Sequence, residues 1–208
     1  MRAYLSAASM SGVVAFVAGL ALHAPGPVLA VAAIAGATAL AAWLSSAQST
    51  DTEAGLALSN PAWTLTLVLR GRRRATDLLP LWAAQVVGAL VAGLVVQALG
   101  DRLPGPLVWP SADLVATGVV ALVLGIVSAW VACAADTYVS EGLTGLPVLA
   151  AGAALPLNLA AVLNPATLFG ITVAGLLDWQ PAAIGAAGAI LGAALGAWSA
   201  GPVTVNPE

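Results

Sequence analysis

Two stretches of the sequence are the most informative about its structure: LSNPAWTLTLVLRG at residues 58–71 and LNPATLFGITVAG at residues 163–175. Each contains an Asn-Pro-Ala box, which consists of Asn60, Pro61 and Ala62 in the first stretch and of Asn164, Pro165 and Ala166 in the second. The apolar segment of each box has about eleven residues, whereas a helix that crosses a bilayer needs about 20. Asparagine is a preferred N-cap, and proline suits the first helical position, where its missing N–H is not needed. Each stretch therefore predicts a half-helix that begins at its asparagine.

Six longer apolar segments surround the two boxes, and we expect each of them to cross a membrane. They are residues 4–22, 28–47, 78–99, 112–133, 143–157 and 181–200. The chain of 208 residues is 61% hydrophobic and only 7% charged, whereas a soluble domain is about 25% charged. The first segment runs past the length of a signal core, so we expect it to be a retained span. The composition predicts an all-α membrane protein whose partner is the lipid bilayer.

Charge and special residues exclude several classes of protein. The formal net charge is −3, which disfavours binding to nucleic acid. One cysteine excludes an internal disulfide, and one histidine excludes a metal site built from several histidines. The lone His23 has no evident partners for a catalytic triad, and the carboxylates are scattered through loops. We expect no enzyme activity, no cofactor and no metal.

The chain contains an internal repeat with a period of 104 residues, because Asn164 and Asn60 are 164 − 60 = 104 positions apart. The same shift places Gly88-Ala89 on Gly192-Ala193. The repeat divides the chain into 1–104 and 105–208, each with three spans and one half-helix. Because three is odd, the halves are predicted to lie in the membrane in inverted orientations. Close helix crossings are expected at Gly88, Gly93, Gly188, Gly192 and Gly196.

The basic residues predict the orientation of the spans. Those expected on one side of the membrane are Arg2, Arg70, Arg72, Arg73 and Arg74. Only Arg102 falls on the opposite side, so the positive-inside rule places both termini in the cytoplasm. The basic residues are all arginine, and the high alanine and glycine content indicates a bacterial source with a GC-rich genome. We therefore expect a multi-pass protein of the cell membrane, located in the bacterial inner membrane.

The paired half-helices indicate a channel for neutral molecules. Each helix N-terminus carries about half a positive charge from its aligned peptide dipoles. Two half-helices that enter from opposite faces bring these ends together near the membrane centre, where they repel cations. Asn60 and Asn164 can cap their helices with oxygen and donate from their amide groups to a passing water. Such a water turns its hydrogens outward, which interrupts a proton wire while the water itself moves on.

The paired boxes, in LALSNPAWTLTLVLRG and AAVLNPATLFG, resemble those of the major intrinsic protein family of aquaporins and glycerol facilitators. The stretch DLLPLWAAQVVGALVAG at residues 77–93 resembles the third span of that family. The resemblance implies six tilted spans, two re-entrant half-helices and a homotetramer with one pore in each subunit. It also implies that the transported molecules are water, glycerol or other small uncharged solutes.

The sequence departs from the family at its selectivity filter. The family usually places an arginine directly after the second box, where this chain has Thr167. By the family's pattern, the other filter positions fall on Leu40, Gly152 and Ala161, so the usual aromatic residue and histidine are missing too. Without a guanidinium and bulky rings, we expect a wide, apolar external filter. The central boxes would then supply most of the ion exclusion.

The family also tends to place a glutamate in the first and fourth spans, where it braces the half-helices. The corresponding positions here are Ala8 and Asp113. Asp113 is expected either to brace a half-helix or to lie outside the hydrocarbon and cap the fourth span. Two alternatives to an open channel remain at this stage. One is a non-conducting structural relative, and the other is a proton-coupled transporter that uses Asp113.

Overall fold

The structure is a computed structural model, and it describes residues 2–48, 58–107, 113–134, 145 and 159–200. Five helices in these ranges are long and apolar enough to cross a membrane. They are α1 (Arg2–Ala21), α2 (Pro27–Gln48), α5 (Leu78–Leu99), α6 (Leu114–Ala134) and α11 (Trp179–Ser199). Each agrees with a segment expected from the sequence to within a few residues. The remaining expected span, 143–157, lies outside the described residues except for Gly145.

Shorter helices lie between the spans. Two of them are the half-helices α4 (Pro61–Leu69) and α10 (Pro165–Val173), which follow the two boxes. The others are α9 (Leu159–Val162) and the 3₁₀ turns η1 (Ala75–Asp77) and η2 (Gly100–Arg102). In the part of the chain that the structure describes, all regular secondary structure is helical. The fold is thus an all-helical bundle with two short helices inside it.

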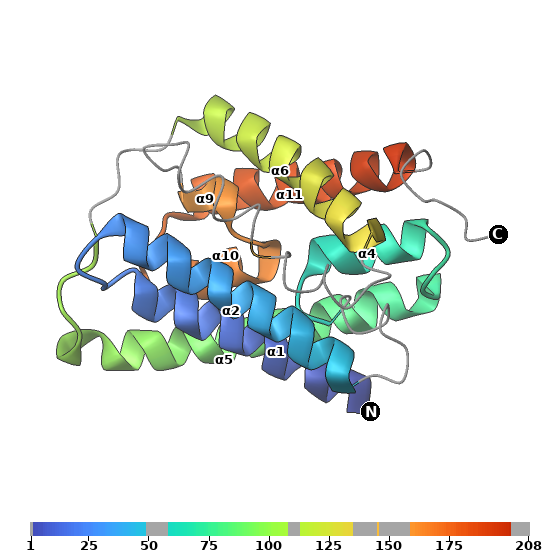
Figure 1. The fold of residues 1–208 in the computed structure, drawn as a ribbon. Coiled ribbons are helices and arrows are strands. Elements are labelled where there is room, and N and C mark those ends of the chain that lie inside the picture. The colour runs from blue at the N-terminus through green and yellow to red at the C-terminus, as the bar shows by residue number, and fades with distance from the viewer. Residues whose placement is uncertain (1, 49–57, 108–112, 135–144, 146–158, 201–208) are drawn as a thin grey trace.

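The long helices lie side by side in two groups (Figure 1). One group contains α1, α2 and α5, and the other contains α6 and α11 with the short α9 beside them; α4 and α10 lie between the groups. The most extensive contacts join α1 to α5 and α6 to α11. Both pairs therefore join the first and the last described span of their half of the chain.

Small residues let these helices approach closely. A Cβ on Gly188 would lie 2.8 Å from the Cβ of Ala121, and one on Gly196 would lie 2.6 Å from the Cβ of Ala129. On Gly88, Gly93 and Gly192, a Cβ would collide with a backbone carbonyl of a neighbouring helix. The five glycines expected at helix crossings are thus confirmed there. In lipid, no hydrophobic effect drives helices together. Close van der Waals packing therefore supplies the energy that associates them.

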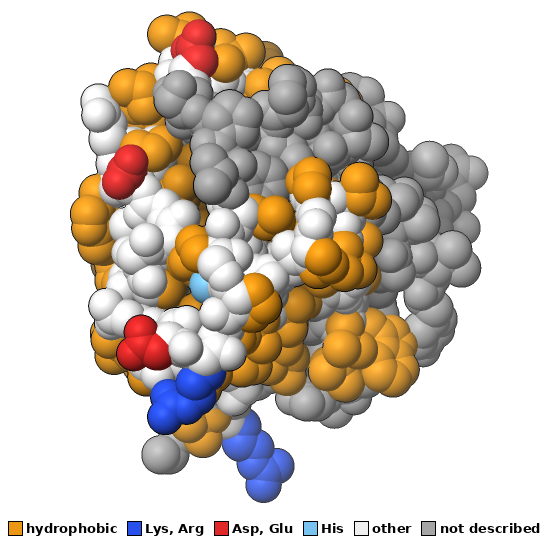
Figure 2. Space-filling model, turned by 90° about the vertical axis from the view of Figure 1, so that its left-hand side faces the viewer, with side chains coloured by type: hydrophobic (Ala, Val, Ile, Leu, Met, Phe, Trp, Pro, Cys, Tyr) orange, Lys and Arg blue, Asp and Glu red, His pale blue; other side chains and the backbone are white. Residues whose placement is uncertain are grey.

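The two ends of the bundle differ in charge. At one end, the Leu107 N–H donates to the Leu22 carbonyl at 2.7 Å, and His23 Nδ1 contacts the Pro104 carbonyl. We call it the His23 end, and its described surface is mostly apolar or uncharged, with charged side chains toward the edge (Figure 2). At the other end, which we call the arginine end, α4 ends at a loop with the basic residues Arg70, Arg72, Arg73 and Arg74.

Candidate functional site: the paired half-helices

The first half-helix begins at Asn60, which lies in an extended conformation with φ −147° and ψ 121°. Its Oδ1 accepts a hydrogen bond from the Ala62 N–H at 2.9 Å, and its carbonyl accepts from the Thr64 N–H at 3.0 Å. Pro61 occupies the first helical position. The residue is thus an N-cap, as its sequence pattern predicts.

The second half-helix begins in the same way at Asn164, where Oδ1 accepts from the Thr167 N–H at 3.0 Å. The Asn164 carbonyl accepts from the Leu168 N–H at 2.9 Å, and Pro165 is the first helical residue. In both caps the side chain uses its oxygen toward its own helix. The amide Nδ2, which carries two hydrogens, remains as the atom that can donate away from the helix.

The half-helices point in opposite directions. Trp63 and Leu67 of α4 pack against Ala42 and Ala132, which lie late in α2 and α6, toward the arginine end. Leu168 and Ile171 of α10 instead belong to a buried cluster at the other end, and its further members include Leu22, Ala30 and Ala182. The C-termini therefore lie toward opposite ends of the bundle. The N-termini point toward its middle, and Figure 1 shows α4 and α10 end to end.

Two long helices hold both half-helices in series. Along α5, Trp82 and Gln85 contact α4, whereas Ala89 and Gly93 lie against α10. Along the antiparallel α11, Gly185 lies against Leu168 of α10, and further on the Ala193 carbonyl accepts a bond from Thr66 of α4. The order of these contacts places the two boxes close to the middle of the bundle.

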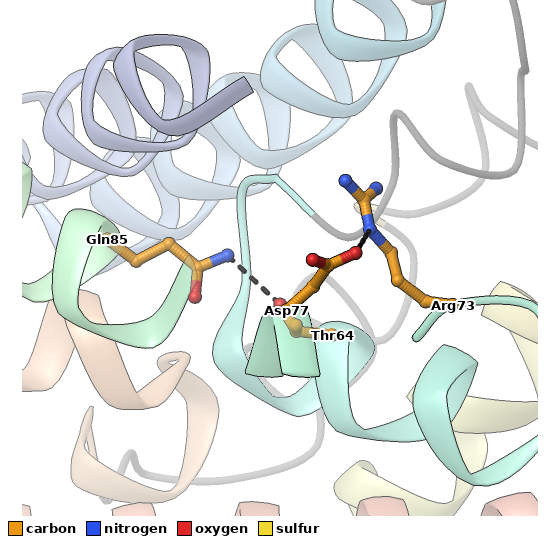
Figure 3. A network of polar contacts seen from close by, with 4 residues as sticks. All are labelled: Thr64, Arg73, Asp77 and Gln85. Atoms are coloured by element: carbon orange, nitrogen blue, oxygen red, sulfur yellow. Dashed lines mark hydrogen bonds and ion pairs between the residues drawn. The ribbon is translucent and has the colours of Figure 1, made fainter. Parts of the chain in front are cut away.

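Polar side chains connect α4 to its neighbours. The indole N–H of Trp82 donates to the Pro61 carbonyl at 2.9 Å. Gln85 Nε2 donates to Thr64 Oγ1 at 3.1 Å, a contact that Figure 3 shows between α5 and α4. The indole N–H of Trp63 donates to Ser128 Oγ on α6. Sequence reasoning missed these contacts, although a glutamine inside an apolar span is itself a signal that could have identified Gln85.

Both half-helices end at a glycine with positive φ, Gly71 at 69° and Gly175 at 77°. After α4, the N–H groups of Arg72 and Arg73 donate to the Leu67 carbonyl at 2.9 and 3.2 Å. The Arg72 guanidinium donates to the Cys133 carbonyl at the end of α6 at 3.1 Å. Cations near helix C-termini offset the negative end of the dipole. The arginine loop therefore stabilises the outer ends of two helices, one of them a half-helix.

The positions expected for the filter are only partly described. Thr167 is fully buried, and its hydroxyl has no hydrogen-bond partner within the described residues. Leu40 is 49% exposed and shares the outward face of α2 with Leu29 and Trp43. That placement counts against Leu40 as a filter residue, although the assignment itself stays a prediction. Gly152 and the side chain of Ala161 lie outside the described residues.

Asp113 lies at the exposed start of α6, where its Oδ1 accepts from the N–H groups of Val115 and Ala116 at 2.9 and 3.1 Å. These two bonds are the ones expected if Asp113 caps the helix of the fourth span. The bracing role of Asp113 stays a prediction beside this observed cap. Within the described ranges, no group of three or more His, Cys, Asp or Glu could hold a metal ion.

The fold resembles that of an aquaglyceroporin. The X-ray structure of the aquaglyceroporin from Plasmodium falciparum matches it with a TM-score of 0.74 over 95% of this chain and 93% of that chain. The two sequences are 17% identical, so the match establishes the fold alone. No protein-family model and no curated protein matches the sequence. The chain therefore has an aquaporin-like fold with apolar spans and two half-helices.

Proposed function

We propose that this chain is a passive transmembrane channel for water and small uncharged solutes such as glycerol, and that it excludes ions and protons. The observation that carries the proposal is the pair of opposed half-helices, each capped by the side-chain oxygen of an asparagine. Their N-termini place partial positive charge at the middle of the bundle, which repels cations. The amide groups of Asn60 and Asn164 then donate to the oxygen of a passing water. That water points its hydrogens along the file, and its oxygen is not free to accept a proton from either neighbour, so the file cannot relay protons.

The proposal includes an inverted repeat that relates residues 1–104 to 105–208. Several contacts support it, because they recur with the period of the boxes. Thr66 contacts the Ala193 carbonyl, and Gly170 lies against the Ala89 carbonyl, with 170 − 66 = 104 and 193 − 89 = 104. The glycines that end the half-helices are also 175 − 71 = 104 positions apart. We further propose a homotetramer with one pore in each subunit and cytoplasmic termini, in the inner membrane of a bacterium.

For the external filter, we propose that Thr167 takes the place of an arginine and that the filter is therefore wide and without fixed charge. Ala161 would contribute a methyl group and Gly152 only its backbone at the same level, with Leu40 as the fourth filter position. The absence of a guanidinium removes a fork of five donors, which favours solutes larger than water. Glycerol is the test solute for this width.

Stopped-flow light scattering on proteoliposomes tests the function. We expect the purified protein to raise both the water and the glycerol permeability above that of protein-free liposomes. Water flux without glycerol flux would refute the wide filter and leave the channel intact. Permeability at the lipid background for both molecules would instead favour a non-conducting relative. Dependence of solute flux on a proton gradient would indicate a coupled transporter, which the exposed position of Asp113 disfavours.

A further inference from the structure

We infer that Gln85, together with Trp82, is a positioning residue that sets the rotation of α4 and thereby aims Asn60 at the passage. The inference rests on the proposed function and adds to it the contacts that hold the first Asn-Pro-Ala box in its orientation. It concerns a side chain that contacts α4 rather than the transported molecule. Gln85 is completely buried, at 0% exposure, in a helix that crosses the membrane.

Two side chains of α5 donate hydrogen bonds to α4. Trp82 donates to the Pro61 carbonyl, and Gln85 donates to the Thr64 hydroxyl. Residues three apart lie on the same face of a helix, and the donors 82 and 85 match the acceptors 61 and 64 in this spacing. Two contacts spaced along one face of α4 oppose its rotation about its own axis, as does the bond from Trp63 to Ser128 of α6.

The hydroxyl of Thr64 connects Gln85 to the first box. Thr64 Oγ1 accepts from Gln85 Nε2 at 3.1 Å and donates to the Asn60 carbonyl at 3.1 Å. One hydroxyl therefore links the buried amide of α5 to the backbone of the N-cap residue. Thr64 is completely buried, and Asn60 is 7% exposed. Hydrogen bonds in such a site are stronger than in water because the local dielectric constant is low.

In contrast to α4, the helices α1 and α10 pack against α5 through close backbone contacts. Beside Gly88, one turn after Gln85, α1 presents the backbone of Ala8 in close packing. The second half-helix is located by backbone packing too, since Gly170 lies against the Ala89 carbonyl and Gly93 lies against Gly170. Among these neighbours, α5 supplies α4 with polar side chains. Its contact with Thr64 therefore bears on the direction of Asn60.

The test uses the full chain in proteoliposomes and two nearly isosteric variants, Gln85→Met and Thr64→Val. For each we measure water permeability per channel by stopped flow, and proton leak with an entrapped pH-sensitive dye. We expect each variant to lower water permeability and to raise the ratio of proton leak to water flux about fivefold, as the loss of one hydrogen bond of about 1 kcal/mol implies. The double variant should equal the single ones, because both remove the same link.

Two further variants separate positioning from simple loss of stability. Thr64→Ser keeps the hydroxyl and should retain the wild-type ratio. Thr172→Val removes a buried hydroxyl of α10 that donates to the Leu168 carbonyl of its own helix, and it should leave the ratio unchanged. A wild-type ratio in Thr64→Val, or the same increase in Thr172→Val, would overturn the inference. An impermeable wild-type protein would refute the proposed function instead. If Gln85→Met fails to fold, the three threonine variants decide the question.

Discussion

Asn60 and Asn164 each offer an oxygen that accepts in the helix cap and a separate nitrogen that can donate elsewhere. Serine and aspartate cap a helix about as well as asparagine does, because each offers a side-chain oxygen. Only asparagine couples that acceptor to an amide with two hydrogens that can donate elsewhere. Both half-helices use Oδ1 for the cap. The choice of asparagine at both positions therefore favours a role for the donor as well as for the cap.

Replacing Asn60 by aspartate separates the donor from the cap. Asn60→Asp keeps an oxygen for the Ala62 N–H but places an anionic acceptor where the amide donates. We expect the proton leak of proteoliposomes to rise about tenfold, which corresponds to a barrier lower by about 1.4 kcal/mol. The measurement is the decay of a pH gradient reported by an entrapped dye. Gln97→Glu, on an exposed position of α5, is the control, and an equal leak in both variants would contradict the prediction.

Asp113 permits a second test at this scale. Asp113→Ala removes the acceptor for the Val115 and Ala116 N–H groups and should destabilise the protein by about 1 kcal/mol. Asp113→Asn retains a capping oxygen and should restore most of that stability. Thermal unfolding in detergent measures both changes. Because the residue lies at the helix end, water permeability per folded channel should stay at the wild-type value, and a selective loss of permeability would support the bracing role.

Individual residues were predictable where a local rule governs them. The caps at Asn60 and Asn164 follow from helix-end chemistry, which needs no knowledge of the fold. Asp113 left two interpretations open because its role depends on where α6 begins relative to the membrane. Leu40 was assigned by counting along the chain, and counting does not tell which face of α2 points inward. The contact of Gln85 with Thr64 requires the packing of α5 on α4, which no local pattern contains.

At the scale of elements, the half-helices are held by different means. Trp82, Gln85 and Ser128 form hydrogen bonds with α4, whereas Gly93 and Gly170 bring α10 against the backbone of α5. Hydrogen bonds between side chains fix rotation, and close backbone packing fixes distance. Replacing a glycine in such a contact by a residue with a side chain would require one of the two helices to move. The spacing of glycines therefore determines how the spans pack.

Gly192 provides the test of this packing. A Cβ on Gly192 would collide with the Leu122 carbonyl and lie 2.9 Å from the Cα of Gly125, so we expect Gly192→Ala to destabilise the protein by about 1–3 kcal/mol. Gly36→Ala is the matched control, because no atom lies within 4 Å of a Cβ built there. Alanine favours helix over glycine by up to about 1 kcal/mol, so the control should be neutral or stabilising. Chemical unfolding in mixed micelles measures both, and equal stabilities would contradict the argument.

The spans themselves were predictable because membrane insertion imposes a simple requirement. Every backbone polar group in lipid must be satisfied within the helix, so apolar runs of sufficient length become helices. The expected spans 4–22 and 78–99 accordingly agree closely with α1 and α5. The start of α6 at Leu114 rather than near 112 reflects the Asp113 cap. The neighbours of each helix were less predictable, because apolar composition alone does not determine which face of a helix packs against another helix.

At the scale of the whole molecule, the distribution of charge distinguishes the two ends of the bundle. The arginine end carries Arg70, Arg72, Arg73 and Arg74, and Arg73 forms an ion pair with Asp77 at 3.8 Å. The opposite end carries Arg102 beside Asp101. Cytoplasmic loops carry an excess of arginine and lysine. The arginine end is therefore expected to face the cytoplasm, and the His23 end is expected to face outward.

Accessibility of introduced cysteines tests this orientation. Thr76→Cys lies exposed next to the arginine end, and Gly105→Cys lies exposed near the His23 end. The native Cys133 is buried, so its background labelling should be low. In spheroplasts, a membrane-impermeant maleimide should label Gly105→Cys at least about tenfold more than Thr76→Cys, and inside-out vesicles should reverse the ratio. The opposite pattern would show that the arginines of this loop act on the helix ends they contact rather than on topology.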